Sequence, residues 1–248
     1  MEFEEQGRVA PADARSCLAV EDLLLQMMYE SRMQFTRNLF ASIYSLLYHQ
    51  LAWAYDYIAA AVSLGRWNHW VQSTLPFSRG RVMELGFGTG HLQKTFYENS
   101  ILAFGVDESL QMIRESRHLL CTNSIPLRLI RGYAQYLPFI SEYFDTVVST
   151  FPAEYIFDPR TILEIKRVLV PTGKFILLPT AWITGTRLSD RLLAWLLRKL
   201  GLTKGELRSI STSIKDQFTQ YGFEMQSEII SLKGSQVLII QATKLPGL

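Results

Sequence analysis

Three glycines at alternate positions, Gly86, Gly88 and Gly90, are the residues of this sequence best suited to holding a ligand. They follow a short apolar run, and a helical pattern begins directly after them. Glycine adopts positive φ without strain and lets backbone N–H groups approach a ligand closely. The helix adds the unpaired N–H groups of its first turn. The order of strand, glycine-rich turn and helix therefore predicts a site for a polar ligand.

Two acidic residues narrow the kind of ligand. Asp107 ends a second apolar run about twenty residues further on, where an acid in this topology faces the ribose hydroxyls of a nucleoside. Glu84 lies inside the first strand, where a carboxylate would repel a pyrophosphate but suits the ammonium group of a methionine moiety. His91 stands where a dinucleotide fingerprint has its third glycine. These features favour S-adenosylmethionine and disfavour a nicotinamide cofactor.

The elements that must position these residues alternate between short strands and helices. Such alternation is typical of a parallel sheet with helical crossovers. It predicts an α/β fold with a Rossmann-like, doubly wound, mostly parallel sheet of seven strands. We expect strands over Arg81–Leu85, Ile101–Val106, Leu127–Ile130, Phe144–Thr150 and Lys174–Pro179, and helices over 90–98, 109–120 and 159–169.

The two ends of the chain differ from this central pattern. Apolar residues recur at helical spacing over residues 13–75, so we expect an N-terminal helical cap over residues 1–75 that is part of the same domain. Residues 76–248 form the expected S-adenosylmethionine-binding domain. Its last part is predicted to contain helices over 187–200 and 206–221, then an antiparallel hairpin of strands 223–232 and 236–243.

Several segments resemble a known family in the expected order. Val82–Leu92 resembles motif I of class I S-adenosylmethionine-dependent methyltransferases, and Gly105–Met112 resembles their second motif. Segments 131–139, 143–149 and 163–173 resemble the remaining motifs, so roughly residues 80–180 are covered. Residues 52–57 and 63–70 are similar to the entry region of ubiquinone and menaquinone biosynthesis methyltransferases, which are methyltransferases of type 11.

The resemblance implies a role for individual residues. It implies that the turn and Glu84 hold the methionine end of the donor, that Asp107 holds the ribose, and that no metal is needed. Two positions depart from the family pattern, since Glu108 and Tyr133 stand where the family often has an apolar residue and an aspartate. The implied cofactor-binding residues are Glu84, Gly86, Phe87, Gly88, Gly90, Asp107, Ala134 and Gln135 at the adenine edge, and Ser149 near the donor methyl.

The acceptor side is less sharply defined by the sequence. Glu154 and Tyr155 follow the fourth strand, at the edge where open α/β sheets place substrates. Tyr55 belongs to the predicted cap, which covers the cofactor in the resembling family. His69 and His91 are further general-base candidates, but no residue is assigned as catalytic. The expected reaction is methyl transfer by in-line displacement to a small, largely apolar acceptor, such as a quinone-like or phenolic compound, with S-adenosylhomocysteine as product.

Composition excludes several other functions. The chain has 248 residues, of which 48% are hydrophobic, and a formal net charge of +2, so it has no basic footprint for nucleic acid. Its two cysteines, Cys17 and Cys121, are far apart, which favours a reducing, cytoplasmic location without disulfides or a metal site. The acidic N-terminus does not resemble a secretory signal. The low-charge stretch 39–65 contains too many polar residues for a favoured membrane span.

Three alternatives stay open at this point. The predicted helix 187–200 has an apolar stripe with basic flanks, which also suits peripheral contact with a membrane. The same fold without catalysis would serve as a nucleoside-binding or partner-binding protein. An NAD-dependent oxidoreductase is the third interpretation. The sequence does not define the acceptor or the oligomeric state.

Overall fold

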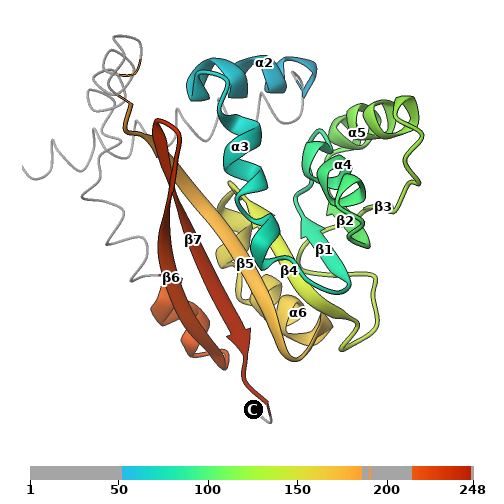
Figure 1. The fold of residues 1–248 in the computed structure, drawn as a ribbon. Coiled ribbons are helices and arrows are strands. Elements are labelled where there is room, and N and C mark those ends of the chain that lie inside the picture. The colour runs from blue at the N-terminus through green and yellow to red at the C-terminus, as the bar shows by residue number, and fades with distance from the viewer. Residues whose placement is uncertain (1–51, 186–189, 191–213, 247–248) are drawn as a thin grey trace, which may run out of the picture. The chain divides into compact units, whose positions relative to one another are not determined.

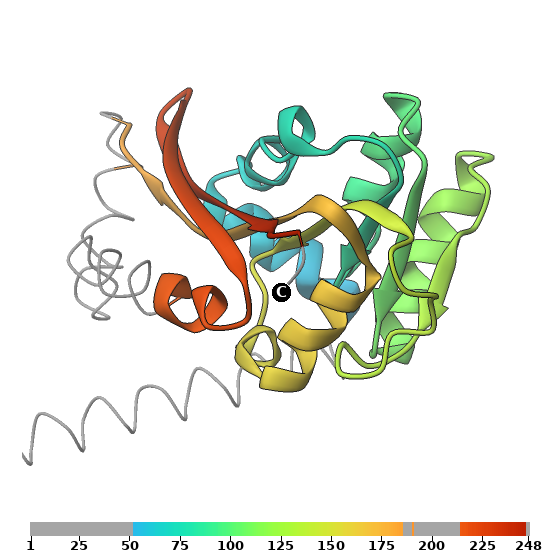
Figure 2. The same ribbon diagram turned by 90° about the horizontal axis from the view of Figure 1, so that it is seen from below.

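The structure, a computed structural model, describes residues 52–185, 190 and 214–246. All of these residues belong to one unit, residues 47–248. For residues 52–56 and 58, only the backbone is described. Figure 1 shows a twisted sheet with helices packed along it, and Figure 2 shows helices on both sides of that sheet.

Seven strands of the described part form one sheet in the order β3-β2-β1-β4-β5-β7-β6. The first five strands in this order are parallel, whereas β7 runs antiparallel to both β5 and β6. This topology confirms the predicted fold class, including the C-terminal hairpin. The strands are β1 (Val82–Leu85), β2 (Ala103–Asp107), β3 (Leu129–Arg131), β4 (Phe144–Thr150), β5 (Leu169–Ile183), β6 (Phe223–Leu232) and β7 (Ser235–Lys244).

Two apolar layers hold helices against the two faces of the sheet. Trp70 of α3 and Phe96 of α4 lie in one buried cluster, while Ile165 of α6 and Phe218 of the helical residues 214–219 lie in the other. The crossover helices therefore form close to their predicted positions. The helices are α2 (Ala52–Ser63), α3 (Trp67–Gln72), α4 (His91–Glu98), α5 (Leu110–Thr122) and α6 (Pro159–Val168), with 3-10 turns η1 (Leu75–Phe77) and η2 (Glu154–Phe157).

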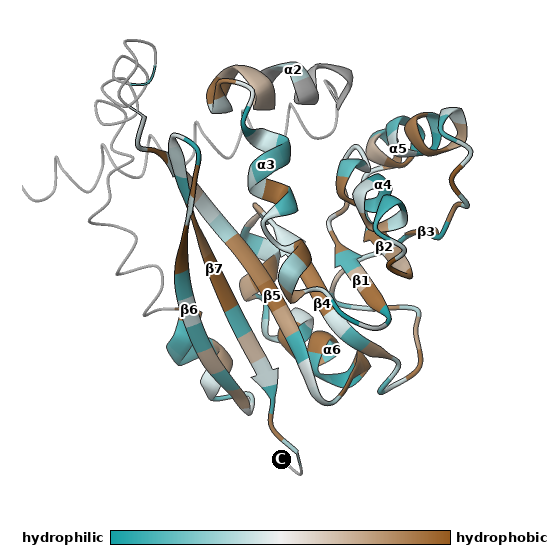
Figure 3. Ribbon diagram, viewed as in Figure 1, coloured by the Kyte–Doolittle hydropathy of each residue, from teal (hydrophilic) through white to brown (hydrophobic). Residues whose placement is uncertain are grey.

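The hairpin closes one edge of the sheet with a polar strand. Most residues of β6 are exposed, whereas the centre of β7 is buried between β5 and β6. Figure 3 shows the same contrast, with β6 largely hydrophilic and β5 and β7 apolar along much of their length. A polar edge strand discourages pairing with other chains, since its free N–H and C=O groups are accompanied by charged side chains.

The prediction that a strand ends at Pro179 is wrong, because β5 continues to Ile183. β5 pairs with β4 as far as Leu178, and beyond that point it pairs with β7 alone. The β5–β7 register shifts between Leu177 and Thr180, and Pro179 lies inside this irregularity. Proline lacks an N–H group, so a bulge, where the ladder is interrupted, is a position at which a strand tolerates it.

Other expectations lie partly or wholly outside the described residues. The predicted cap is described only from residue 52 onward, and the predicted helix 187–200 only at Asp190. Of the predicted helix 206–221, residues 214–219 are described and are helical. Within the described ranges, no helix combines the length and the apolar character needed to cross a bilayer. The domain boundary at residues 75 and 76 stays a prediction.

Helix α6 allows a direct test of this packing. Asp158 caps the helix by accepting a hydrogen bond from the Arg160 N–H at 2.9 Å. We expect Ile165→Ala to lower the free energy of unfolding by about 2–5 kcal/mol, because Ile165 is fully buried. Leu163→Ala, at an exposed position of the same helix, should cost less than about 1 kcal/mol. Urea unfolding measures both; equal losses would contradict this assignment of the buried face.

Candidate functional site

The glycine-rich turn lies at the point where the strand order reverses. β1 pairs with β2 on one side and with β4 on the other. In doubly wound sheets, ligands bind at such a point, outside the carboxyl ends of the strands. β1 ends at Leu85 and β2 ends at Asp107, so the turn and this acid share one edge of the sheet.

The turn leaves open space beside Gly88. The φ angles of Gly86, Gly88 and Gly90 are 76°, 53° and 87°. The Gly86 N–H donates to the Val106 carbonyl at 2.8 Å, and Gly90 caps the N-terminus of α4. A methyl group built on Gly88 would meet no atom of the described residues within 4 Å. The backbone at Gly88 therefore faces a space that a ligand can fill.

Asp107 connects the turn to the start of the next helix. One carboxylate oxygen accepts from the Gly88 N–H at 3.0 Å, and the other accepts from the Ser109 N–H at 2.9 Å. The side chain is almost fully buried. The structure thus brings Asp107 and the turn into direct contact.

Glu84 is a buried acid with one close side-chain donor. The Gln93 side-chain amide donates to its carboxylate at 2.7 Å. Burial raises the pKa of Glu84 to about 8, the Gln93 hydrogen bond lowers this pKa, and the negative charge of Asp107 raises it. Glu84 is therefore largely neutral near pH 7 in this structure. A cation beside this carboxyl group would favour its charged form.

Ser149 and Tyr155 meet at the carboxyl end of β1, on the side of the sheet that packs against α6. The Ser149 hydroxyl is fully buried and donates to the Leu85 carbonyl at 2.8 Å. The Tyr155 hydroxyl lies 3.4 Å from the same carbonyl oxygen and 3.5 Å from the Ser149 hydroxyl. A methyl group built on Gly86 would lie 2.5 Å from the Tyr155 hydroxyl. Two residues expected on different sides of the reaction are therefore neighbours.

The loop after β3 carries the predicted adenine-edge residues. Ala134 is buried, and the Gln135 amide donates to the Asp158 carboxylate at 3.2 Å. The Gly132 N–H donates to the Asp107 carbonyl at 3.1 Å, which places this loop beside the end of β2. The ring of Tyr133 is exposed. The loop thus lies at the same edge as Asp107, while the Gln135 side chain contacts Asp158, the N-cap residue of α6.

The remaining candidates are more dispersed. Phe87 points into the core, because a methyl group on Gly105 would lie 2.7 Å from its ring, so only its backbone faces the turn. Glu154 is exposed on η2, and His69 is exposed on α3. Tyr55 lies in α2, but its side chain is outside the described part. Among the acceptor-side candidates whose side chains are described, Tyr155 is the one with a contact at the end of β1.

Comparisons with known proteins agree with this geometry. A family model described as a methyltransferase domain matches residues 83–177, which contain the turn, Asp107 and Ser149. A demethylmenaquinone methyltransferase of Thermobifida fusca is 28% identical over 164 residues, which are 63% of this chain and 68% of that protein. The ubiquinone/menaquinone biosynthesis C-methyltransferase UbiE of Bordetella avium is 27% identical over 183 residues, 68% of this chain and 72% of that protein.

The methyltransferase domain and these relatives together support a class I S-adenosylmethionine-dependent methyltransferase. A solved structure with the same fold is the PH0226 protein of Pyrococcus horikoshii, with a TM-score of 0.50 and 21% identity. The aligned part covers 69% of this chain and 88% of that one. This methyltransferase thus shares its fold with proteins of distant sequence.

Sequence reasoning missed two contacts of this methyltransferase. Gln93 was not singled out, although a polar residue on the inner face of the helix after a glycine-rich turn can reach back to the strand. The hydroxyl of Tyr155 was assigned to the acceptor side, but its position over Gly86 was not foreseen. Its contact with Leu85 joins residues 70 apart in the chain, and no local pattern reports such a distance.

The buried acid predicts a pH-dependent stability. Between the ordinary pKa of 4.5 for a glutamate and the pKa of about 8 in the folded chain, folding takes up a proton at Glu84. The free energy of unfolding should therefore fall as the pH rises through this window, by at most about 1.4 kcal/mol per pH unit. We expect Glu84→Gln to flatten this slope, as measured by urea unfolding from pH 5 to 9 without added ligand. Glu98→Gln, at an exposed position of α4, should leave the slope intact; equal slopes for all three proteins would contradict the assignment.

Proposed function

We propose that this methyltransferase transfers a methyl group to a small, largely apolar acceptor of quinone-like or phenolic character. When bound, S-adenosylmethionine supplies an electrophilic methyl group on a sulfonium; a bond forms from the acceptor atom to the methyl carbon as the carbon–sulfur bond breaks, giving S-adenosylhomocysteine. The acceptor loses a proton. Catalysis of this kind depends mainly on positioning and on exclusion of water.

The observation that carries the cofactor assignment is the open face of Gly88 beside the Asp107 carboxylate. The Asp107 carboxylate lies against this turn, where we propose that it accepts hydrogen bonds from the ribose hydroxyls of the donor. Glu84 lies on the same edge, where the ammonium group of the donor would favour its charged form. These residues fit a nucleoside that carries a positively charged amino acid.

The same proposal assigns roles at the rest of the edge. Ala134 and Gln135 are proposed to face the adenine, and Ser149 and Tyr155 to lie near the transferred methyl group. In support of this, the Tyr155 hydroxyl lies over the first glycine of the turn. Glu154 and Tyr55 are retained as acceptor-side candidates. No residue is proposed as the general base.

Two observations support an apolar acceptor. The names of the relatives compared above point to quinone precursors as substrates of those proteins. In addition, Trp67 and Phe151 stack at 4.4 Å between ring centroids, and Phe151 directly follows β4. An aromatic pair beside the carboxyl edge suits a planar acceptor ring. A small molecule rather than a nucleic acid is therefore the proposed partner, and a cytoplasmic location stays a prediction.

The cofactor site is tested by a matched pair of glycine substitutions. Gly88 and Gly65 both have positive φ, and an added methyl group at either would meet nothing within 4 Å. We expect Gly88→Ala to weaken S-adenosylhomocysteine binding at least about tenfold, because the methyl group would occupy the ligand space. Gly65→Ala carries a similar backbone cost and should bind normally. Calorimetry measures both, with NAD as the non-binding comparison. Unchanged affinity in Gly88→Ala would refute this site.

The role of Tyr155 is tested by removing its hydroxyl. We expect Tyr155→Phe to lower kcat/KM for the acceptor about tenfold, since the hydroxyl lies where donor and acceptor meet. Donor affinity should change less than about twofold. A labelled-methyl assay with naphthoquinol, phenolic and amine acceptors gives the rates, and Tyr133→Phe is the control at an exposed ring. An unchanged rate, or a loss confined to donor binding, would count against this placement.

A further inference from the structure

A second site lies at the hairpin end of the same sheet edge. A cavity of about 460 Å³ is lined by Arg66 and His69 beside α3, by Asp190, and by the hairpin turn that contains Lys233. The turn between β6 and β7 pairs with the end of β5, since Ser235 is opposite Ile183. Because β5 is parallel to β4, this cavity opens at the carboxyl edge that also holds the glycine-rich turn.

The Arg66 side chain has more N–H donors than the described residues around it supply acceptors. One terminal nitrogen, Nη2, donates to the Asp190 carboxylate at 2.7 Å. The other, Nη1, is buried and has no hydrogen-bond partner among the described residues. A buried donor without a partner is costly, and such a group marks a position where an acceptor is missing.

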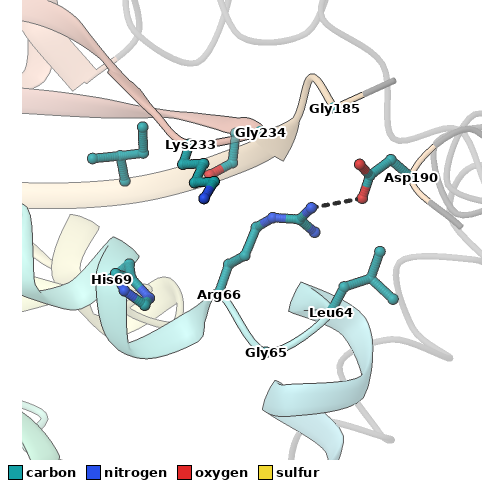
Figure 4. A pocket seen from close by; sticks show the side chains of 10 residues that line it. Leu64, Gly65, Arg66, His69, Gly185, Asp190, Lys233 and Gly234 are labelled. Carbon is teal, nitrogen blue, oxygen red and sulfur yellow. Dashed lines mark hydrogen bonds and ion pairs between the residues drawn. The ribbon is translucent and has the colours of Figure 1, made fainter. Parts of the chain in front are cut away.

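Lys233 and His69 add basic groups to the same lining. Figure 4 shows the side chains of Arg66, His69 and Lys233 around one space, with Asp190 paired to Arg66. Lys233 has no ion pair within the described ranges. Since Asp190 offsets the charge of Arg66, the charge of Lys233 makes the net charge of the described lining positive.

The walls of the cavity are fixed by contacts between distant segments. The Gly234 carbonyl accepts from the N–H groups of Thr184 and Gly185 at 3.1 and 3.0 Å. The Trp70 indole donates to the Ser235 hydroxyl at 2.9 Å, and this contact is buried. These bonds hold the hairpin turn against both α3 and the end of β5. The basic groups are therefore presented by a connected frame.

An aromatic pair adjoins Arg66 in the chain. Trp67, which follows Arg66 in the chain, stacks on Phe151. Phe151 lies two positions after Ser149, the residue proposed to lie near the transferred methyl group. Both rings are partly exposed. The pair packs against the buried cluster that contains Trp70, and its partly exposed rings offer an apolar surface next to Arg66 in the chain.

We propose that the cavity binds a carboxylate or phosphate group of the methyl acceptor, so that the acceptor is an amphipathic acid with an apolar body. This inference rests on the proposed function, because it assigns the cavity to the acceptor. An anionic oxygen satisfies Arg66 and pairs with Lys233, while the apolar body lies along Trp67 and Phe151. Charge-assisted hydrogen bonds of this kind are strong and specific.

Calorimetry with small aromatic anions tests the cavity directly. The probes are benzoate and phenyl phosphate, with benzamide as the neutral match, added to protein saturated with S-adenosylhomocysteine. We expect at least one anion to bind and benzamide to bind at least about tenfold more weakly. The stronger of the two anions identifies whether the group is a carboxylate or a phosphate. Absence of binding by both anions would overturn the proposal.

Charge substitutions locate that binding. Lys233→Gln should weaken the anion about three- to tenfold, whereas Lys174→Gln, an exposed lysine of β5 outside the cavity lining, should not. Arg66→Gln combined with Asp190→Asn removes both partners of the ion pair, so that no buried charge is left alone, and should reduce binding by more than tenfold. Equal affinity in the parent, Lys233→Gln and the double variant would overturn the site.

Failure of the proposed function gives a different result. If S-adenosylhomocysteine does not bind but benzoate affinity still depends on Lys233, the anion site stands and the proposed function falls, together with the assignment to an acceptor. If both ligands bind, the anion should compete with the acceptor found in the labelled-methyl assay, raising its apparent KM without changing kcat. Lack of competition would overturn the assignment of the cavity to the acceptor.

Discussion

The hydrogen bond from the Gly88 N–H to the Asp107 carboxylate is the contact on which the arrangement of the site depends. The same aspartate accepts from the Ser109 N–H through its other oxygen, and its carbonyl accepts from the Gly132 N–H. The loops that follow three consecutive strands, β1, β2 and β3, are thus held by one residue. Because the residue is buried, these bonds are shielded from competition with water. The edge of the sheet is therefore ordered before any ligand is considered.

Glu84 shows the energetic cost of burying a second acid at this edge of the sheet. Burial beside another acid favours the neutral form of the Glu84 carboxyl group. The hydrogen bond from Gln93 alone does not restore the charged form at neutral pH. An apolar residue at position 84 would avoid the burial of a polar group. The presence of an acid there is physically understandable if a cation is a recurrent neighbour, since a perturbed acid at a strand end is typical of ligand sites. Packing alone gives no reason for it.

The sequence predicted the local parts of this fold well, and its site assignments stay predictions. The apolar runs, the glycine-rich turn and Asp107 are all short-range patterns, and β4 and β6 have the predicted bounds. The prediction at Pro179 failed because a bulge against β7 decides whether the strand continues, and β7 lies 55 or more positions away. The contact of Tyr155 with Leu85 has the same cause. The periodicity of a sequence indicates whether a segment forms a helix or a strand, whereas such contacts depend on which segments pack together in the fold.

The cavity beside Arg66 is the feature that the sequence predicts least, because its ion pair joins residues 124 positions apart. Neither residue stands out in the sequence, since an arginine after a glycine and an aspartate in a predicted helix are ordinary. These two residues become neighbours only in the folded sheet. In its strand order β7 lies between β5 and β6, and the hairpin turn lies at the carboxyl edge. One half of that edge carries the buried acids Glu84 and Asp107, and the other half carries basic groups. Opposite charges at the two halves suit a cationic donor at one and an anionic partner at the other, which ties the orientation of both molecules to the strand order itself.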